Sequence, residues 1–248
     1  MRVGVISEGL ADFAVVRSVV KGVMGLDAAD VDPIRPELQT DETSLHAKGA
    51  ASFSNWEIVK QECVEGRRIR AYLDSILDER RIVVVHIDSA ECHLAGFDVM
   101  RPDRGSGSYV VDCRRAVAEA IHRWTAGDHA EHLVAAVAVE ETDAWLIPLY
   151  DPEIASKERD SGTIRDAKKH LFRVLQRTGR LTATARVRIL KERHALTQYA
   201  LLSAPLGKVR DLREVLQHNA SLMLFVDELC DLVERVQPGT CRLRPAAG

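Results

Sequence analysis

Long apolar runs mark the predicted strands in the first part of the chain. Residues 81–87 (RIVVVHI) and 133–139 (LVAAVAV) are almost continuously apolar. Strands that helices cover on both faces have this pattern, so each run predicts a central strand of a parallel sheet. The run at 3–6 (VGVI) predicts another strand, and apolar positions at helical spacing across 10–24 predict the helix that follows it.

The same periodicity predicts further helices. Residues 56–77 and 110–125 carry apolar side chains at helical spacing, and Glu65-Gly66 is a candidate interruption of the first. Residues 27–55 and 92–108 are expected to be loops, apart from a short strand near 31–34. Past residue 150 no comparable strand pattern follows, and we expect a polar loop at 151–163 and helices at 164–178, 184–204, 207–217 and 221–236.

This order of elements predicts an α/β fold. Strands that alternate with helices favour a parallel sheet flanked by helices, and the later segments favour a helical C-terminal lobe. We expect an α/β domain at 1–150, the helical lobe at 151–237 and a frayed tail at 238–248.

Composition narrows the class of protein. The chain has 248 residues, 46% of them hydrophobic, which is enough for a substantial core. Its formal net charge of −3 argues against a generally polybasic protein but leaves room for a local basic groove. The sequence has no apolar stretch of transmembrane length, and its five cysteines are scattered without a CxxC pair. We therefore expect a reduced, cytoplasmic protein that has no disulfide scaffold and does not bind a membrane.

Acidic residues follow each of the strong strand patterns. Glu8 follows the first strand, Asp88 the 81–87 strand, and Glu141 and Asp143 the 133–139 strand. Parallel strands present their carboxyl ends at one edge of the sheet, where ligands bind. Clustered carboxylates repel one another and are typical ligands of Mg²⁺, so the pattern predicts a magnesium site. The alternative is that these acids cap the following helices, as Asp12 does by its place in a first turn.

Short motifs in the same order resemble a known family. The segment 3–12 (VGVISEGLAD) looks like the first motif of Toprim domains, and the strand that ends at Asp88 resembles the second. The element 141–146 (ETDAWL) and the segment 218–225 (HNASLMLF) are similar to those of small Toprim-like bacterial proteins catalogued as a domain of unknown function, DUF4276. The resemblance extends over about residues 1–235, and it is distantly shared with the Toprim domains of overcoming-lysogenization-defect (OLD) nucleases.

The resemblance implies a nuclease or related phosphodiester-processing enzyme that depends on Mg²⁺ or Mn²⁺. It implies Glu8 as the general acid/base and as a metal ligand, and Asp88 as a catalytic metal ligand, with further ligands from Glu141 and Asp143. DNA or RNA would be the substrate. Relatives of this kind also resemble components of anti-phage systems that work beside an ATPase partner, which is an expectation by analogy.

One motif departs from the family pattern. The usual second motif is Asp-x-Asp, whereas this chain has Asp88-Ser89-Ala90-Glu91. Glu91 is the candidate replacement ligand from one position further on. Two alternatives therefore stay open beside the nuclease: a degenerate Toprim-like interaction subunit that works with an ATPase or another effector, and an α/β domain whose acidic strand ends bind nothing.

The remaining candidates surround the 88–108 segment. His93 and Asp12 are expected to support the acid/base chemistry, and Arg101, Arg104 and Arg114 to contact a substrate phosphate. His86 lies inside the predicted strand, and we expect it to pack or hydrogen-bond within the sheet, since no four-ligand zinc spacing surrounds it. The basic residues of the helical half are expected to form a solvated surface.

Overall fold

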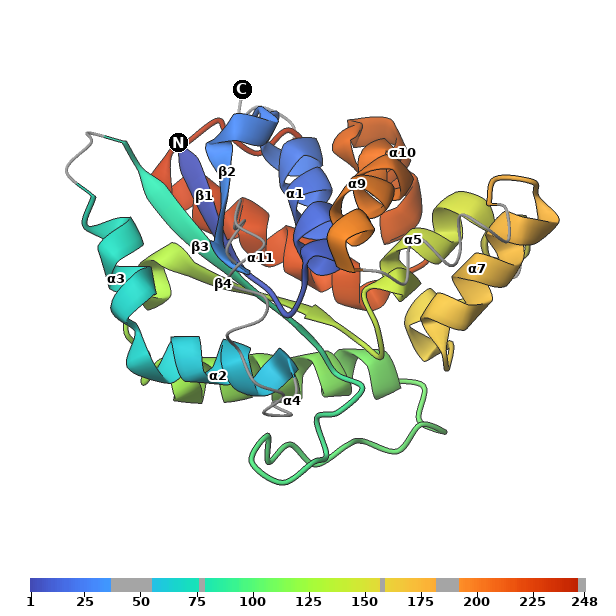
Figure 1. Ribbon diagram of the computed structural model, residues 1–248, viewed down its shortest axis with the longest axis horizontal. Helices are drawn as coiled ribbons and strands as arrows, with labels where there is room; N and C mark the ends of the chain where they lie inside the picture. Colours follow the sequence, from blue (N-terminus) through green and yellow to red (C-terminus); the bar gives the residue numbers. More distant parts are fainter. Residues whose placement is uncertain (37–54, 76–78, 157–158, 182–191, 245–248) are drawn as a thin grey trace.

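A parallel sheet forms the centre of the computed structural model, which describes residues 1–36, 55–75, 79–156, 159–181 and 192–244. Its strands are β1 (Arg2–Ile6), β2 (Val31–Arg35), β3 (Arg81–Asp88) and β4 (Leu133–Ala138). They are all parallel, in the order β2-β1-β3-β4 (Figure 1). Helices cover both faces, so the predicted α/β fold with a helical C-terminal region is confirmed.

Alternate residues of the strands enter two separate cores. Ile82 and Val84 of β3 point to one face of the sheet, whereas Val83 and Val85 point to the other, and all four are fully buried. This alternation is the side-chain period of a β-strand. Because both sets are apolar, each face of the sheet requires a cover of helices.

The first face is covered by helices from both halves of the chain, which share one apolar core. They are α1 (Leu10–Met24), α5 (Asp143–Tyr150), α7 (Ala167–Arg177), α9 (Glu192–Ser203), α10 (Val209–Leu216) and α11 (Ala220–Val236). The second face is covered by α2 (Asn55–Glu65), α3 (Arg67–Leu73) and α4 (Tyr109–Trp124). In Figure 1, α2 and α4 lie below the sheet and α3 lies at its left.

Some boundaries differ from the predicted ones. The candidate interruption of the predicted 56–77 helix is confirmed at Gly66, whose φ of +60° favours glycine and separates α2 from α3. The expected loop at 151–163 contains the short helix α6 (Pro152–Ser156) and the 3₁₀ turn η4 (Ser161–Thr163). The Asp160 carboxylate caps η4 by accepting the Gly162 N–H at 2.7 Å. The start of the predicted 184–204 helix and most of the 27–55 loop lie outside the described residues.

The C-terminal segment as far as Arg244 contacts the body of the protein. Cys241 forms a disulfide with Cys230 of α11, and the Arg242 N–H donates to Val23 O of α1 at 2.7 Å. The sequence does not predict this bridge, because a separation of 11 residues matches no cysteine motif.

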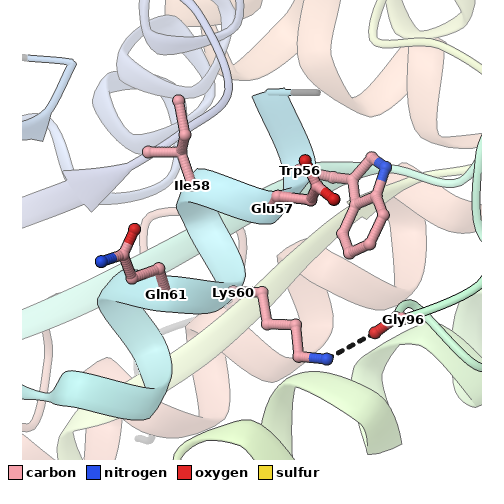
Figure 2. A pocket seen from close by; sticks show the side chains of 6 residues that line it. All are labelled: Trp56, Glu57, Ile58, Lys60, Gln61 and Gly96. Atoms are coloured by element: carbon pink, nitrogen blue, oxygen red, sulfur yellow. Dashed lines mark hydrogen bonds between the residues drawn. The ribbon is translucent and has the colours of Figure 1, made fainter. Parts of the chain in front are cut away.

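A hollow of about 270 Å³ lies beside α2 (Figure 2). Lys60 crosses it to donate a hydrogen bond to Gly96 O at 2.5 Å, and Trp56 packs on Phe97 with 5.0 Å between ring centroids. These contacts tie α2 to the turn after β3. None of the predicted site residues lines this hollow. Its lining consists of Trp56, Glu57, Ile58, Lys60, Gln61 and Gly96.

Among the helices of the described residues, none combines the length and the apolar character that crossing a bilayer requires.

Candidate metal site

The carboxyl ends of β1, β3 and β4 meet at one edge of the sheet, as their parallel register dictates. Ile6 of β1 lies opposite Val85 of β3, and Asp88 lies opposite Ala138 of β4. Glu8, two residues past the end of β1, accepts the backbone N–H of Asp88 through Oε1 at 2.7 Å. Glu8 and Asp88 therefore lie close together, as predicted, and the contact joins the Glu8 side chain to the Asp88 backbone.

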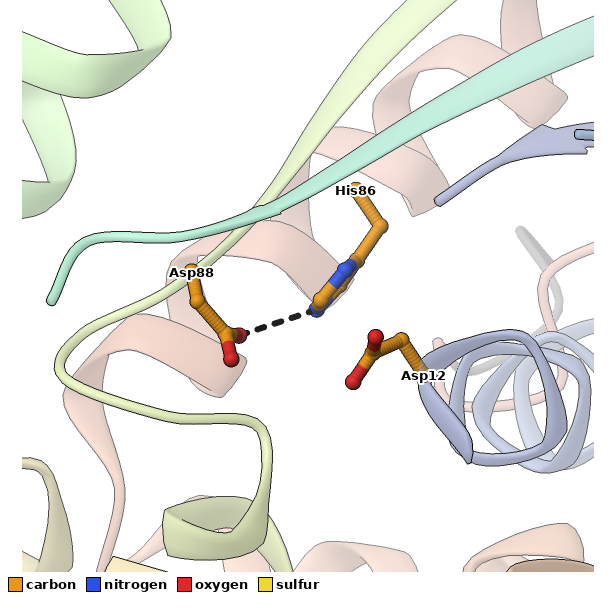
Figure 3. Close-up of side chains that lie close together, drawn as sticks. All are labelled: Asp12, His86 and Asp88. Carbon is orange, nitrogen blue, oxygen red and sulfur yellow. Dashed lines mark ion pairs between the residues drawn. The ribbon is translucent and has the colours of Figure 1, made fainter. Parts of the chain in front are cut away.

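Asp12, His86 and Asp88 form the tightest group of potential ligands at this edge, which we call the Asp12–His86–Asp88 cluster. One ligand atom of each lies within 4.8 Å of the others. Figure 3 shows the three side chains converging from α1 and β3, with His86 Nε2 3.8 Å from Asp88 Oδ1. His86 and Asp88 share a face of β3 because they are two residues apart.

Thr142 lies at the centre of this cluster. Its Oγ1 is 2.8 Å from Asp12 Oδ1, 2.8 Å from Asp88 Oδ1 and 3.1 Å from His86 Nε2. Its backbone N–H also donates to Asp88 Oδ1 at 3.0 Å. A hydroxyl carries one proton, so Oγ1 can donate to only one of the two carboxylates at a time.

The electrostatics of the edge favour a bound cation. Burial raises the pKa of Glu8 to about 8, with further increases from the charges of Asp12 and Glu91. Burial, followed by the charges of Asp12 and Glu8, also raises the pKa of Asp88 well above its usual range. Burial lowers the pKa of His86, which favours the neutral imidazole that binds metals. A divalent cation would compensate the carboxylate charges.

The donor set fits a divalent metal ion. Two carboxylates and one imidazole converge, and the imidazole of His86 is fully buried. The Asp88 side chain keeps 25% of its surface exposed, so the cluster is open to solvent. Sites of this kind keep coordination positions for water or substrate beside the protein ligands.

Two predicted ligands have partners away from the cluster. Asp143 is buried, and its Oδ1 accepts the hydroxyl of Tyr199 at 2.7 Å. Burial raises the pKa of Asp143 to about 7. Glu141 Oε2 accepts the N–H of Lys168 at 2.8 Å, in the first turn of α7. Glu141 therefore caps a helix, but a distant one rather than the next helix that the sequence alternative named.

Glu91 and His93 are exposed on the turn after β3. The charge of Glu91 acts on Glu8, and in the described residues neither Glu91 nor His93 belongs to a group of three potential ligands with convergent atoms. Their predicted roles as ligand and as proton-transfer helper stay predictions.

The three predicted phosphate-contacting arginines are divided between two places. Arg101 and Arg104 both pair with Glu140, just past the end of β4, and Arg101 Nη2 also donates to Ala90 O at 2.7 Å. Arg114 is buried between α4 and α11, where it binds Glu228 and donates to Ala135 O at 3.1 Å. The structure therefore brings Arg101 and Arg104, but not Arg114, to the segment that follows Asp88.

Sequence reasoning missed His86 and Thr142 as members of the site. His86 does hydrogen-bond inside the fold, as expected, but its partner is Thr142 in the cluster. The spacing of His86 and Asp88 was an available signal, since residues two apart in a strand share a face. Trp145 packs behind the cluster, with its ring centroid 5.6 Å from that of His86 and its Nε1 bonded to Ser221.

Comparisons of this chain with protein-family models, curated protein sequences and solved structures found no match.

Proposed function

We propose that this protein is a Toprim-like hydrolase of phosphodiester bonds in DNA or RNA that depends on Mg²⁺ or Mn²⁺. The convergence of Asp12, His86 and Asp88 at the carboxyl edge of a parallel sheet is the observation that carries the proposal. Ligands of open α/β sheets bind at this edge. The resemblance of the Glu8 and Asp88 segments to Toprim motifs supports the choice of phosphodiester chemistry.

Each side chain has a distinct part in this mechanism. Asp12, His86 and Asp88 would hold the ion, which polarises a phosphoryl oxygen and promotes ionisation of water when bound. Glu8, fixed by the Asp88 N–H at 2.7 Å, would take the proton of the attacking water. The water oxygen would form a bond to phosphorus as the bond to the leaving oxygen breaks, and the leaving oxygen would take up a proton from solvent water.

The metal donor set differs from the one that the resemblance implies. Asp12 and His86 take the positions beside Asp88, whereas Glu141 and Asp143 bind Lys168 N and Tyr199. We therefore propose a single-ion site. Glu141 and Asp143 would stabilise the segment that presents Thr142 to the cluster.

A second candidate function is a non-hydrolytic subunit that binds a cation and acts with an ATPase partner, for example in anti-phage defence. The observation that favours it is Ala90, which occupies the place of the second acid of Asp-x-Asp. Its N–H donates to Glu140 O at 3.1 Å, and its side chain offers no ligand.

The deciding experiment is a cleavage assay on plasmid DNA, single-stranded DNA and RNA with Mn²⁺ or Mg²⁺. It compares the wild type with Asp88→Asn and Glu8→Gln, and with Asp227→Asn as a matched control, because Asp227 is exposed on α11. We expect cleavage that EDTA abolishes, that both site variants lose and that the control retains.

Cleavage that survives Asp88→Asn would refute the proposed site. A wild type that binds Mn²⁺ through Asp88 but cleaves none of the three substrates would refute the hydrolase and favour the second candidate.

A further inference from the structure

Glu140 is a buried carboxylate in an unusual backbone conformation beside the candidate site. Its φ of +65° lies in the left-handed region, which is strained for a residue other than glycine. Both backbone polar groups of Glu140 form hydrogen bonds. Its N–H donates to the side-chain Oγ of Ser89 at 2.8 Å, and its carbonyl accepts the Ala90 N–H at 3.1 Å. The end of β4 is thereby joined to the residues that directly follow Asp88.

The Glu140 side chain holds two arginines. Oε1 accepts the hydroxyl of Tyr109, while Oε2 pairs with Arg104 and lies 3.8 Å from Arg101 Nη2. Arg104 also stacks over the Tyr109 ring, 5.4 Å from its centroid. Arg101 donates to Ser89 O at 3.3 Å and to Ala90 O at 2.7 Å, so its guanidinium is fixed against the two residues that directly follow Asp88.

The charges of this group do not cancel. Two guanidinium groups share one carboxylate, and within the described residues no other carboxylate lies within 4.0 Å of either arginine. Their side chains are 24% and 23% exposed, so both reach solvent. Among the residues that the structure describes, Arg104 forms an ion pair with Glu140 alone. Further N–H groups of its guanidinium can therefore bind a ligand.

We infer that Arg101 and Arg104 form a phosphate-binding pair, with Glu140 and Tyr109 as the residues that position it beside the Asp12–His86–Asp88 cluster. This inference deepens the proposed function, on which it rests: the ligand is a phosphate group of the nucleic-acid strand next to the bond that is cleaved. Arginine suits this role because its planar fork binds phosphate oxygens with charge-assisted hydrogen bonds. Arg114, bound to Glu228, takes no part.

The first test measures phosphate binding without any catalysis. Inorganic phosphate is titrated in EDTA, and the midpoint of thermal unfolding is followed for the wild type, Arg104→Gln and Arg123→Gln. Gln at 104 keeps an N–H donor for Glu140 but removes the charge. Arg123 is an exposed arginine in the last turn of α4, the helix that follows the turn of Arg104, so it serves as the matched control.

We expect phosphate to raise the midpoint of the wild type and of Arg123→Gln, because a ligand stabilises the state that binds it. For Arg104→Gln we expect a dissociation constant for phosphate about tenfold higher, as loss of a charge-assisted contact predicts. An equal response of all three proteins, or no response of the wild type, would overturn the inference.

The second test separates positioning by Glu140 from simple charge. Glu140→Gln leaves more net positive charge on the arginines, so charge alone predicts a lower KM for an oligonucleotide and an unchanged kcat. Positioning predicts a lower kcat without a higher KM, because the bound phosphate is misplaced. An unchanged kcat in a folded Glu140→Gln variant would refute the positioning role.

The two tests also separate this inference from the proposed function. If Asp88→Asn abolishes cleavage but Arg104→Gln keeps the wild-type KM, the arginine pair is refuted and the hydrolase stands. If no cleavage occurs but Arg104→Gln loses phosphate binding, the hydrolase is refuted and the phosphate site stands.

Discussion

The hydroxyl oxygen of Thr142, Oγ1, lies 2.8 Å from Oδ1 of Asp88 and also 2.8 Å from Oδ1 of Asp12. Two carboxylates therefore compete for one proton at the place where the potential ligands converge. When both carboxylates are ionised, the one that does not receive the proton lies close to a lone pair of Oγ1, which is an unfavourable contact. A cation bound between the carboxylates would remove this conflict, and that makes Thr142 a sensitive reporter of metal binding.

Thr142→Val should destabilise the metal-free protein more than Thr142→Ser. Valine removes the donor and leaves two partly buried carboxylates without it, at a cost of about 1–3 kcal/mol in free energy of unfolding. Serine keeps the hydroxyl. Urea unfolding in EDTA measures the difference, and saturating Mn²⁺ should reduce it because the ion then compensates the carboxylates. Equal stabilities of the two variants in EDTA would contradict the central role of the hydroxyl.

His86 should determine which ion the site prefers. Imidazole is a poor ligand for Mg²⁺ compared with transition-metal ions, so His86→Asn should weaken Mn²⁺ binding more than Mg²⁺ binding. We expect a loss in Mn²⁺ affinity of about tenfold or more, the size of loss that changes around metal ligands cause. Quenching of tryptophan fluorescence by Mn²⁺ measures the affinity, because the Trp145 ring centroid is 5.6 Å from that of His86.

His122→Asn is the matched control for this experiment, since His122 is exposed in the last turn of α4. It should keep the wild-type affinities for both ions. If His86→Asn and His122→Asn gave the same Mn²⁺ affinity, His86 would not be a ligand.

Asp143 should make the stability of the metal-free protein fall as pH rises. Burial raises the pKa of Asp143 from 3.8 to about 7, so between these values the folded protein holds a proton that the unfolded chain releases. The contribution to stability is complete below pH 3.8 and is lost as pH rises through about 7. Asp143→Asn removes this titration while its amide oxygen can still accept the Tyr199 hydroxyl.

The measurement is the free energy of unfolding of both proteins in EDTA from pH 4 to pH 8. The Asn variant should gain on the wild type across this range by about 1 kcal/mol or more. Asp227→Asn, at an exposed position of α11, should show no such gain. A constant difference between Asp143→Asn and the wild type would show that Asp143 is ionised in the fold at pH 4.

The strands were predictable because their apolar runs are long and continuous. The predicted 81–87 and 133–139 strands agree with β3 and β4, and the helix predicted at 10–24 coincides with α1. The convergence of Glu8 and Asp88 also followed from parallel strands sharing an edge. Such features depend on local pattern and on one topological rule.

The partners of the acidic residues were not predictable, because they depend on contacts between distant segments. Asp143 meets Tyr199 and Glu141 meets Lys168 only after the C-terminal helices pack on the first face of the sheet. The role of Thr142 depends on the turn after β4, and no spacing rule specifies the direction of its side chain. Arg114 likewise follows the Asp88 segment in the chain, yet its place on α4 directs it to Glu228.

Arg114 and Arg104 should therefore behave in opposite ways when substituted. Arg114 is 5% exposed and binds both Glu228 and Ala135 O, so it joins α4 to α11 and to the edge of β4. Arg114→Met should lower the free energy of unfolding by about 1–3 kcal/mol, because the Ala135 carbonyl and Glu228 lose their donor. Since Glu228 is 46% exposed, it can turn to solvent, which keeps the loss below that of a fully buried pair. Phosphate affinity and KM should stay at wild-type values below the unfolding transition.

Arg104→Gln should instead raise the dissociation constant for phosphate with a smaller loss of stability, because Arg101 and Tyr109 still contact Glu140. Urea unfolding and phosphate titration of both variants decide the matter, and a loss of phosphate binding in folded Arg114→Met would return Arg114 to the substrate site.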